Sequence, residues 1–281
     1  MKTFSKEPGT EPRRQIDCPV CGAAEFRSLW TSEHYLFARC RGCGLVYQNP
    51  QPLQAILAQR YDEEYFVYEK ENEERYYRLM RLGLEDIGFD AMASGIPENK
   101  RTIVDIGCAT GKLISCLQQS GWRVQGVEIC AASAEYGRQT YGVPIHIGPL
   151  ESGGFPDGSF SVAHCSHLIE HLTDPKKFLQ EVSRILTADG RLIISTPNIA
   201  GFQARLMGEK WRSAIADHII LYSRKTLRRL LEANGFRICR MKTWGGIGAG
   251  IVPGWIKKPA DFLAKRSGVG DVMIVLAGRR L

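Results

Sequence analysis

Two patterns of hydrophobic positions alternate along the chain after residue 100. Short apolar runs predict buried strands, and segments with an apolar residue at every third or fourth position predict amphipathic helices. The expected strands read TIVDIG, RVQGVE, PIHIG, FSVAHCS, RLIIST, FRICRMKTW and DVMIVLAGR, and the expected helices cover 112–120, 131–141, 176–186, 201–207 and 225–233. This alternation predicts an α/β domain over residues 100–281, with a mainly parallel seven-stranded sheet between two layers of helices. Because the last two strands follow each other directly, the final strand can be antiparallel.

Residues 53–92 carry apolar and aromatic side chains at helical spacing, which predicts one helix and assigns residues 51–99 to a helical linker or lid. The aromatic positions, among them Tyr61, Tyr65 and Phe66, suit packing against a core. The same residues could instead cover a ligand pocket, because this segment directly precedes the α/β domain. Both interpretations remain open.

The composition is that of a globular protein, with 44% of the 281 residues hydrophobic and 24% charged. These proportions exclude collagen-like, disordered and disulfide-rich classes. No apolar run approaches the roughly 18 residues of a membrane-spanning helix. The polar start MKTFSKEPGTEPRR lacks the apolar core of a signal peptide. We therefore expect a soluble, cytoplasmic protein.

Four cysteines form two C-x-x-C pairs, Cys18 with Cys21 and Cys40 with Cys43, and a glycine follows each pair. Such turns direct two thiolates at one centre, and two of them supply the four sulfurs of a tetrahedral Zn²⁺ site. With four protein ligands, the zinc would be structural rather than catalytic. Residues 1–50 are therefore expected to form a loose N-terminal tail followed by a zinc ribbon.

The other five of the nine cysteines share no spacing pattern. Free cysteine usually behaves as a small buried apolar residue, and we expect this of Cys116 and Cys239. A reducing compartment suits all of these thiols.

A glycine-rich turn, Val-Asp-Ile-Gly-Cys-Ala-Thr-Gly over residues 104–111, joins the first expected strand to the helix after it. Glycine lets the backbone approach a ligand, and the helix start presents free amide groups. The spacing differs from the G-x-G-x-x-G of dinucleotide enzymes and from a phosphate loop. Asp105 in this turn would repel a pyrophosphate but suits a cationic group. The next strand ends at Glu128, whose carboxylate can accept hydrogen bonds from both ribose hydroxyls, so the arrangement predicts a cofactor site.

The stretch VDIGCATG followed by Glu128 resembles the first motif of class I S-adenosylmethionine-dependent methyltransferases, which usually reads D-x-G-x-G-x-G. The similarity extends to residue 281 through FPDGSFSVAHCSHLIEHLTDP and EVSRILTADGRLIISTPN. It implies a Rossmann-like methyltransferase fold with S-adenosylmethionine as the methyl donor. Ala109 departs from the motif at its middle glycine, and Pro149 stands where many members have an acid near the adenine.

The resemblance also implies roles for the residues around the donor. The acid matching Asp105 lies near the methionine moiety, and the acid matching Glu128 binds the adenosine ribose. Leu150 and backbone groups are expected to make the adenine contact instead of an acid at Pro149. The complete set of expected cofactor-binding residues is Asp105, Gly107, Cys108, Gly111, Glu128, Ile129, Leu150 and Ser166.

The four-cysteine ribbon, followed by Gly-Leu-Val-Tyr-Gln-Asn-Pro and Tyr-Asp-Glu-Glu-Tyr-Phe, narrows the resemblance to zinc-ribbon methyltransferases of sugar and polysaccharide biosynthesis. Trp211, His218 and SRKTLRRLLEANGF resemble the late segment of the same group and of quinone O-methyltransferases. The resemblance implies methyl transfer to an oxygen or a carbon of a small acceptor.

Three histidines are candidates for the base that takes a proton from the acceptor, in the order His167, His218 and His171. Two of them closely follow the fourth expected strand, beside the expected methyl group. Each can equally be a structural histidine. Together with Glu170 they could also hold a metal ion. Imidazoles and a carboxylate can merely hydrogen-bond, however, and the sequence favours the metal-free interpretation.

Basic residues concentrate in residues 201–281, with 16 against 5 acidic residues in a chain of net charge +7. Within segment 245–266, Lys257 and Lys258 follow Trp255. We expect this segment to face a small anionic acceptor, such as a nucleotide-linked sugar, or to contact a membrane surface peripherally. It can also be a plain basic loop.

Two other functions are less favoured. A zinc-ribbon RNA methyltransferase would use the ribbon and the basic residues to bind nucleic acid. The Asn-Pro-Pro-Tyr motif of base-amino methyltransferases is absent, however, and the fifth expected strand is followed by Pro197 and Asn198. A non-enzymatic protein that binds S-adenosylmethionine is opposed by the intact cofactor turn.

Overall fold

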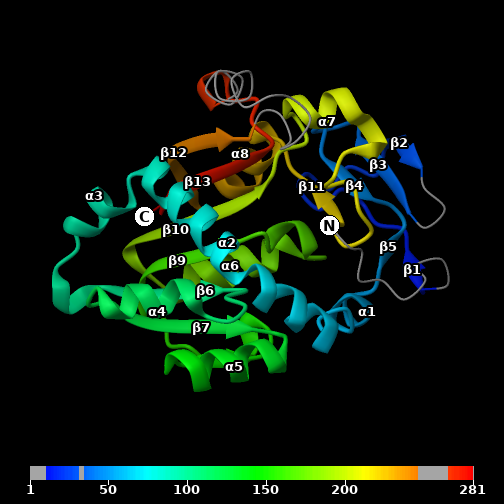
Figure 1. Ribbon diagram of the computed structural model, residues 1–281. Coiled ribbons are helices and arrows are strands. Elements are labelled where there is room, and N and C mark those ends of the chain that lie inside the picture. The colour runs from blue at the N-terminus through cyan, green and yellow to red at the C-terminus, as the bar shows by residue number, and fades with distance from the viewer. Residues whose placement is uncertain (1–10, 32–34, 246–264, 281) are drawn as a thin grey trace, which may run out of the picture.

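The computed structural model describes residues 11–31, 35–245 and 265–280, and a sheet flanked by helices forms its centre (Figure 1). The strands of this sheet in the described residues are β6 (Thr102–Ile106), β7 (Arg123–Glu128), β8 (Ile145–Ile147), β9 (Phe160–Ser166), β10 (Leu186–Pro197), β12 (Phe236–Trp244) and β13 (Val272–Arg279). Their order across the sheet is β12-β13-β10-β9-β6-β7-β8. β13 runs antiparallel to β10 and β12, whereas β10, β9, β6, β7 and β8 are parallel. The predicted α/β fold, with seven strands and an antiparallel last strand, is confirmed.

Helices follow the strands as the periodicity predicts. Their bounds are α4 (Lys112–Gln119), α5 (Ala131–Tyr141), α6 (Pro175–Ile185), α7 (Phe202–Met207) and α8 (Arg224–Ala233), with short 3-10 turns η1 (Glu98–Lys100), η2 (Leu150–Ser152), η3 (Ile169–His171) and η4 (Gly208–Lys210). Side-chain caps define two of the helix starts: Asp174 accepts from the amide of Lys177, and Ser223 forms a capping box with Thr226. No helix in the described residues is both long and apolar enough to cross a membrane.

The helical segment ahead of the sheet is interrupted, so the prediction of one helix over 53–92 is wrong. It comprises α1 (Gln54–Ala58), α2 (Glu63–Ile87) and α3 (Phe89–Ser94). Asp62 starts α2, because its side chain accepts hydrogen bonds from the amides of Glu64 and Tyr65. Gly88 ends α2 in the left-handed conformation, with a φ of 71°, which glycine adopts without strain.

Alternating side chains of the strands give the sheet two apolar faces. Ile103 and Val162 pack in one buried cluster with residues of α2, α3 and α4. Their neighbours Val104 and Ala163 pack in another cluster with residues of α6 and α8. The sheet therefore lies between two helical layers, and its carboxyl edge stays open for the loops that carry the candidate site.

The N-terminal segment forms a small antiparallel sheet that includes a strand from far along the chain. Its strands are β2 (Phe26–Thr31), β3 (Leu36–Cys40), β4 (Val46–Gln48) and β11 (Ile220–Leu221), in the order β11-β4-β3-β2 (Figure 1). Leu45 and Tyr47 are fully buried in the same cluster as residues of α6 and α8. This sheet therefore packs directly on the larger one.

The segment expected to be a loose tail is paired where the structure describes it. β1 (Arg13–Arg14) pairs with β5 (Gln51–Pro52) in an antiparallel ladder. The amide of Ile16 also donates to the side-chain oxygen of Asn49 at 3.1 Å. Residues 13–16 are therefore part of the folded structure.

Two cysteines outside the C-x-x-C pairs are not buried as predicted, since Cys116 is partly exposed and Cys239 is exposed. Cys239 lies where the register between β12 and β13 shifts from Ile238 to Arg240. Such a bulge takes a residue out of the ladder. Cys116 lies on α4 beside the stripe of buried residues that faces the core.

Gly137 on α5 lets this helix pack closely against the glycine-rich loop. A Cβ at Gly137 would lie 2.4 Å from the carbonyl oxygen of Thr110 and 2.6 Å from Cδ1 of Ile145. Gly137→Ala should therefore lower the free energy of unfolding by about 1–3 kcal/mol, measured by urea denaturation. Gly95→Ala is the control, because its Cβ would meet only the carbonyl oxygen of Met92, at 3.4 Å. Equal losses at both positions would contradict the packing argument.

Candidate active site and cysteine cluster

The glycine-rich loop after β6 folds back onto the end of β7. The amides of Gly107 and Cys108 both donate to the carbonyl oxygen of Val127, at 2.8 and 3.2 Å. Gly107, Ala109 and Gly111 all have positive φ, of 75°, 48° and 75°. Glycine adopts this conformation readily, whereas an L-residue there costs about 1–2 kcal/mol. Ala109, at the position of the motif's middle glycine, is therefore the strained residue of the loop.

Glu128 at the tip of β7 holds this loop through its carboxylate. Its Oε2 accepts from the amide of Ala109 at 2.8 Å, and its Oε1 accepts from the amide of Cys130 at 2.9 Å. The side chain of Glu128 is almost fully buried, and this burial raises the pKa of its carboxyl group. Each carboxylate oxygen can accept more than one hydrogen bond, so Glu128 retains capacity to bind ribose hydroxyls.

A buried hydrogen-bonded pair joins β6 to β9 beside the loop. Nδ1 of His164 lies 2.7 Å from Oδ1 of Asp105, and both side chains are almost fully buried. The two residues are direct partners in the parallel register of the two strands. The sequence selected Asp105 but not its partner, because the pairing depends on a register between strands far apart in the chain.

The other predicted cofactor residues lie near the same edge of the sheet. Ser166 ends β9 and Ile129 directly follows β7, and both are partly exposed. Leu150 starts η2 and is only 3% exposed, so little of its side chain is available to an adenine ring. The cofactor roles of these residues stay predictions.

The two halves of α2 have different surroundings. Leu84 and Ile87, near its end, are buried in the core. At its start, the carbonyl oxygen of Asp62 accepts a weak hydrogen bond from Sγ of Cys130, at 3.6 Å. The first half of α2 therefore lies beside the segment that follows Glu128. The interpretation as core packing agrees with the end of α2, and the interpretation as cover over a ligand pocket stays a prediction.

Tyr61 and Tyr65, at this start, pack edge to face with their ring centroids 5.0 Å apart. Burial raises the pKa of both hydroxyls, and the carboxylate of Glu128 contributes to each increase. Glu170 also raises the pKa of Tyr61. Tyr61 is therefore within electrostatic range of both the cofactor loop and the residues after β9.

Glu69 on α2 is a candidate site residue that the sequence analysis missed. Burial and the nearby carboxylate of Glu128 raise its pKa to about 7, and His167 also lies within electrostatic range. The helical spacing of α2 does not reveal which elements its polar residues face, and the sequence offered no other signal. Two carboxylates therefore lie close together around the predicted donor site.

His167 follows β9 with a φ of 54°, a conformation that few non-glycine residues adopt. Its Nδ1 lies 3.2 Å from Oε1 of Glu170, and its side chain is 47% exposed while Glu170 is fully buried. Thr196 donates to the other oxygen of Glu170 at 2.9 Å. Burial alone would raise the pKa of Glu170, but the bond from His167 and two nearby histidines lower it to about 2. A buried carboxylate therefore orients an exposed imidazole whose Nε2 is available.

His171 and His218 also lie close to Glu170. Nδ1 of His171 donates to the carbonyl oxygen of Asp217, and Nδ1 of His218 to that of Ser213, both at 2.9 Å. The two ring centroids are 4.9 Å apart. Burial lowers the pKa of His218 to about 3, so its imidazole is neutral at pH 7. His218 is only 1% exposed, which disfavours it as a base for an acceptor.

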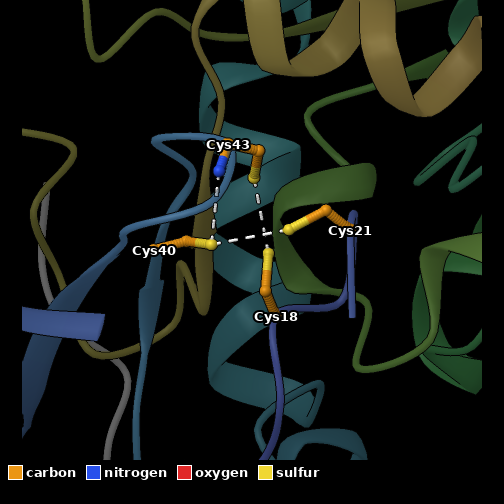
Figure 2. A group of neighbouring side chains, drawn as sticks. All are labelled: Cys18, Cys21, Cys40 and Cys43. Atoms are coloured by element: carbon orange, nitrogen blue, oxygen red, sulfur yellow. Dashed lines mark hydrogen bonds between the residues drawn. The ribbon is translucent and has the colours of Figure 1, made fainter. Parts of the chain in front are cut away.

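The four cysteines of the two C-x-x-C pairs converge on one point (Figure 2). Sγ of Cys18 lies 3.5 Å from Sγ of Cys43, and Sγ of Cys21 lies 3.5 Å from Sγ of Cys40. Zn–S bonds of about 2.3 Å in a tetrahedron place sulfurs roughly 3.8 Å apart. The amide of Cys43 donates to Sγ of Cys40 at 3.4 Å, as expected of such a turn. The spacing therefore fits a four-sulfur metal site.

Most of segment 245–266 lies outside the described residues, including Lys257 and Lys258. The expected contact with an anionic acceptor or a membrane therefore stays a prediction. Lys265 at its end forms an ion pair with Asp86 of α2.

The sequence profile of a family described as a methyltransferase domain matches residues 72–240, more than half of the chain. A protein named "Probable tocopherol O-methyltransferase, chloroplastic" from Oryza sativa subsp. japonica is 26% identical over 125 residues, which are 42% of this chain and 34% of the relative. A ubiquinone biosynthesis O-methyltransferase from Idiomarina loihiensis is 28% identical over 112 residues, covering 35% of this chain and 43% of the relative. The chain thus spans less than half of the length of either relative.

A solved structure of a SAM-dependent methyltransferase from Thermotoga maritima has the same fold. It superposes with a TM-score of 0.54 at 23% identity, over 76% of this chain and 98% of the other. At this identity the likeness concerns the fold alone.

The raised pKa of Glu69 makes stability depend on pH. The folded protein keeps Glu69 protonated up to about pH 7, whereas the ordinary pKa of a glutamate side chain is 4.5. The folded state thus binds the extra proton, and its stability falls as the pH rises through this window. As the pH rises from 5 to 8, the free energy of unfolding of Glu69→Gln should increase relative to that of wild type by up to about 3 kcal/mol. Urea denaturation at each pH measures this difference.

The matched control is Glu71→Gln, which replaces an exposed carboxylate on the same helix. It should leave the pH dependence of wild type unchanged. An equal gain in both variants would show that burial of Glu69 is not the cause.

Proposed function

The chain belongs to the methyltransferase domain family, and from this premise we propose that it transfers a methyl group from S-adenosylmethionine to an oxygen or carbon of a small, anionic, sugar-like acceptor. The observation that carries this proposal is the loop at 107–111, which Oε2 of Glu128 holds at the end of β7 through the amide of Ala109. When bound, S-adenosylmethionine supplies a methyl carbon activated by its bond to a sulfonium sulfur.

The groups around this loop suit a cationic donor. Glu128 and Glu69 lie within electrostatic range of each other, and Asp105 is within range of Glu128. A cationic donor would favour the ionised form of each of these acids, including Glu69, which is protonated up to about pH 7 without the donor. The proposed donor-binding residues are Asp105, Gly107, Cys108, Gly111, Glu128, Ile129, Leu150 and Ser166, to which the structure adds Glu69.

His167 is the proposed proton acceptor. The acceptor atom would bond to the methyl carbon while the bond from that carbon to sulfur breaks and leaves its electron pair on sulfur, and the proton of the acceptor would move to Nε2 of His167. Exposure of this ring and its bond to the buried Glu170 support the role. His171 and His218 are the weaker candidates, because His171 is only partly exposed and His218 is buried, whereas His167 is exposed.

The nature of the acceptor rests on three separate supports. One relative is named as a probable tocopherol O-methyltransferase and another as a ubiquinone biosynthesis O-methyltransferase, and tocopherol and ubiquinone are small molecules. The basic excess of residues 201–281 favours an anionic molecule. The resemblance of the ribbon and late segments to sugar methyltransferases suggests the sugar-like character.

The cysteine cluster is the proposed site of one structural Zn²⁺, bound by Cys18, Cys21, Cys40 and Cys43. Four sulfurs with spacings near those of a zinc tetrahedron support it. Burial raises the pKa of Cys43 to about 11, so a thiolate there needs a cation for stability. Residues 1–50, 51–99 and 100–281 remain the proposed units of tail and ribbon, helical linker or lid, and methyltransferase domain.

Variants of His167 and Glu128 should separate chemistry from donor binding. His167→Ala should lower kcat by about 100-fold or more while the dissociation constant of S-adenosylmethionine stays unchanged. Glu128→Gln should weaken donor binding. Calorimetry measures binding, and release of S-adenosylhomocysteine measures turnover with nucleotide sugars, phosphorylated sugars and quinone precursors. Absence of donor binding in wild type would refute the proposed function, and unchanged kcat in His167→Ala would refute the base.

Zinc at the cysteine cluster should be released by thiol modification. We expect one equivalent of zinc per chain to leave when a mercurial reagent titrates the thiols, measured with a chromogenic chelator. Cys21→Ser should lose this zinc and unfold at a lower temperature. Cys239→Ser removes an exposed thiol outside the cluster and is the control, so zinc loss there would contradict the assignment.

A further inference from the structure

We propose that Glu170, His171 and His218 form a second metal site, which binds a divalent transition-metal ion through one carboxylate oxygen and two imidazole nitrogens. One ligand atom from each residue lies within 4.8 Å of the others. Glu170 and His171 belong to η3, which follows the carboxyl end of β9, and His218 comes from the loop ahead of β11. The fold therefore joins residues that are far apart in the chain.

The hydrogen bonds of the two imidazoles specify which nitrogen is free. Nδ1 of His171 donates to the carbonyl oxygen of Asp217, and Nδ1 of His218 donates to that of Ser213. A carbonyl oxygen only accepts, so in the neutral form of either ring the proton is on Nδ1 and Nε2 carries a lone pair. Histidine ligands of metals commonly have this arrangement, with the other ring nitrogen bonded to a carbonyl.

A carboxylate oxygen and one ring nitrogen of each histidine thus lie within 4.8 Å of one another, and their lone pairs repel one another when no cation is bound. The bonds to Asp217 and Ser213 use Nδ1 of each ring, which leaves Nε2 as the nitrogen that can bind an ion. Glu170 is fully buried and His218 is 1% exposed, so water does not screen the repulsion. A cation removes this repulsion, because each lone pair then points at positive charge.

The type of donor indicates the type of ion. Imidazole nitrogen favours zinc, iron, copper and nickel, and two histidines with one carboxylate form a known open site for such ions. Mg²⁺ and Ca²⁺ prefer oxygen ligands and are disfavoured. Three protein ligands leave at least one coordination position for water or for an oxygen of a ligand.

The positions of the ligands are fixed by bonds from neighbouring segments. Thr196 donates to Oε2 of Glu170 at 2.9 Å, and the amide of Ile219 donates to its backbone carbonyl at 2.9 Å. Gln48 of the N-terminal sheet donates to the carbonyl oxygen of His218 at 3.2 Å. Such supporting bonds hold a metal site in place before the ion binds.

The open side of the cluster faces the start of α2. His171 is the partly exposed member, and the ring of Tyr61 meets it at 6.4 Å. Tyr61 also lies within range of Glu128. An oxygen of the methyl acceptor could therefore occupy the free coordination position, and this last step alone rests on the proposed function.

Titration with Co²⁺ tests the site while zinc occupies the cysteine cluster. Wild type should bind one further equivalent of Co²⁺ with the weak d–d absorption of a nitrogen and oxygen site. Intense thiolate-to-cobalt bands would instead show exchange at the cysteines. Competition with Zn²⁺ should displace this Co²⁺.

His171→Gln and Glu170→Gln should each lower the Co²⁺ affinity about 100-fold or more. His146→Ala is the matched control, because His146 bonds to Ser152 away from the cluster and its loss should change nothing. Retention of the cysteine-bound zinc verifies folding of each variant. Because His171 is partly exposed, His171→Gln should fold even if Glu170→Gln, which changes a buried residue, does not fold.

Two outcomes would overturn the proposal: no second equivalent in wild type, or wild-type affinity in a folded His171→Gln protein. The titration contains no methyl donor, so it is independent of the proposed function. If wild type binds the methyl donor but no second equivalent of Co²⁺, only the metal site is rejected. Co²⁺ binding without any donor binding would reject the methyltransferase proposal alone.

Discussion

The side chain of Gln48 joins the N-terminal sheet to the loop that carries His218, and the geometry of the candidate site depends on this attachment. Its Nε2 donates to the carbonyl oxygens of Ile215, Ala216 and His218, at 3.3, 2.9 and 3.2 Å. Gln48 is fully buried, where removing such bonds would leave polar groups without water. Pairing of β4 with β11 continues the attachment along the chain, so the loop is held as part of the N-terminal sheet.

Arg60 holds the same loop from the helical segment. It donates to the carbonyl oxygen of Ala216 and to Asp217, and its other amino group pairs with Glu11 at 2.7 Å. Segments before and after the cysteine cluster therefore converge on one loop of the α/β domain. A structural zinc in the ribbon would thus support the candidate site without touching it, because the strands that it orders bear the bonds to the loop.

The sequence predicted most elements of the sheet and its helices, since each buried strand or helix face leaves its own local period. It also predicted the cysteine cluster, where spacing within two short turns defines the geometry. The pairing of Asp105 with His164 was beyond it, because strand register is a property of the assembled sheet. The break at Asp62 was a different failure, since an acid followed by two glutamates is a helix-start signal that the aromatic period obscured.

Glu69 and His218 show why the site was only partly predictable. Periodicity placed Glu69 on a helix but could not say what that helix covers. His218 was selected by resemblance, yet its contacts with Glu170 and His171 depend on β11 joining a sheet near the other end of the chain. Sequence reasoning finds residues that share a local motif, whereas a site assembled by tertiary packing needs the fold.

The candidate site has an acidic side and an imidazole side. Glu128, Glu69 and Asp105 surround the loop after β6, and the three histidines gather around Glu170 after β9. In the proposed reaction the donor carries a sulfonium charge that the demethylated product lacks, so the carboxylates hold the donor more tightly than the product. The same carboxylates repel an anionic acceptor from the donor side. Such an acceptor is then restricted to the imidazole side. There the proposed base, His167, can take its proton, and the proposed metal ion can bind its oxygen.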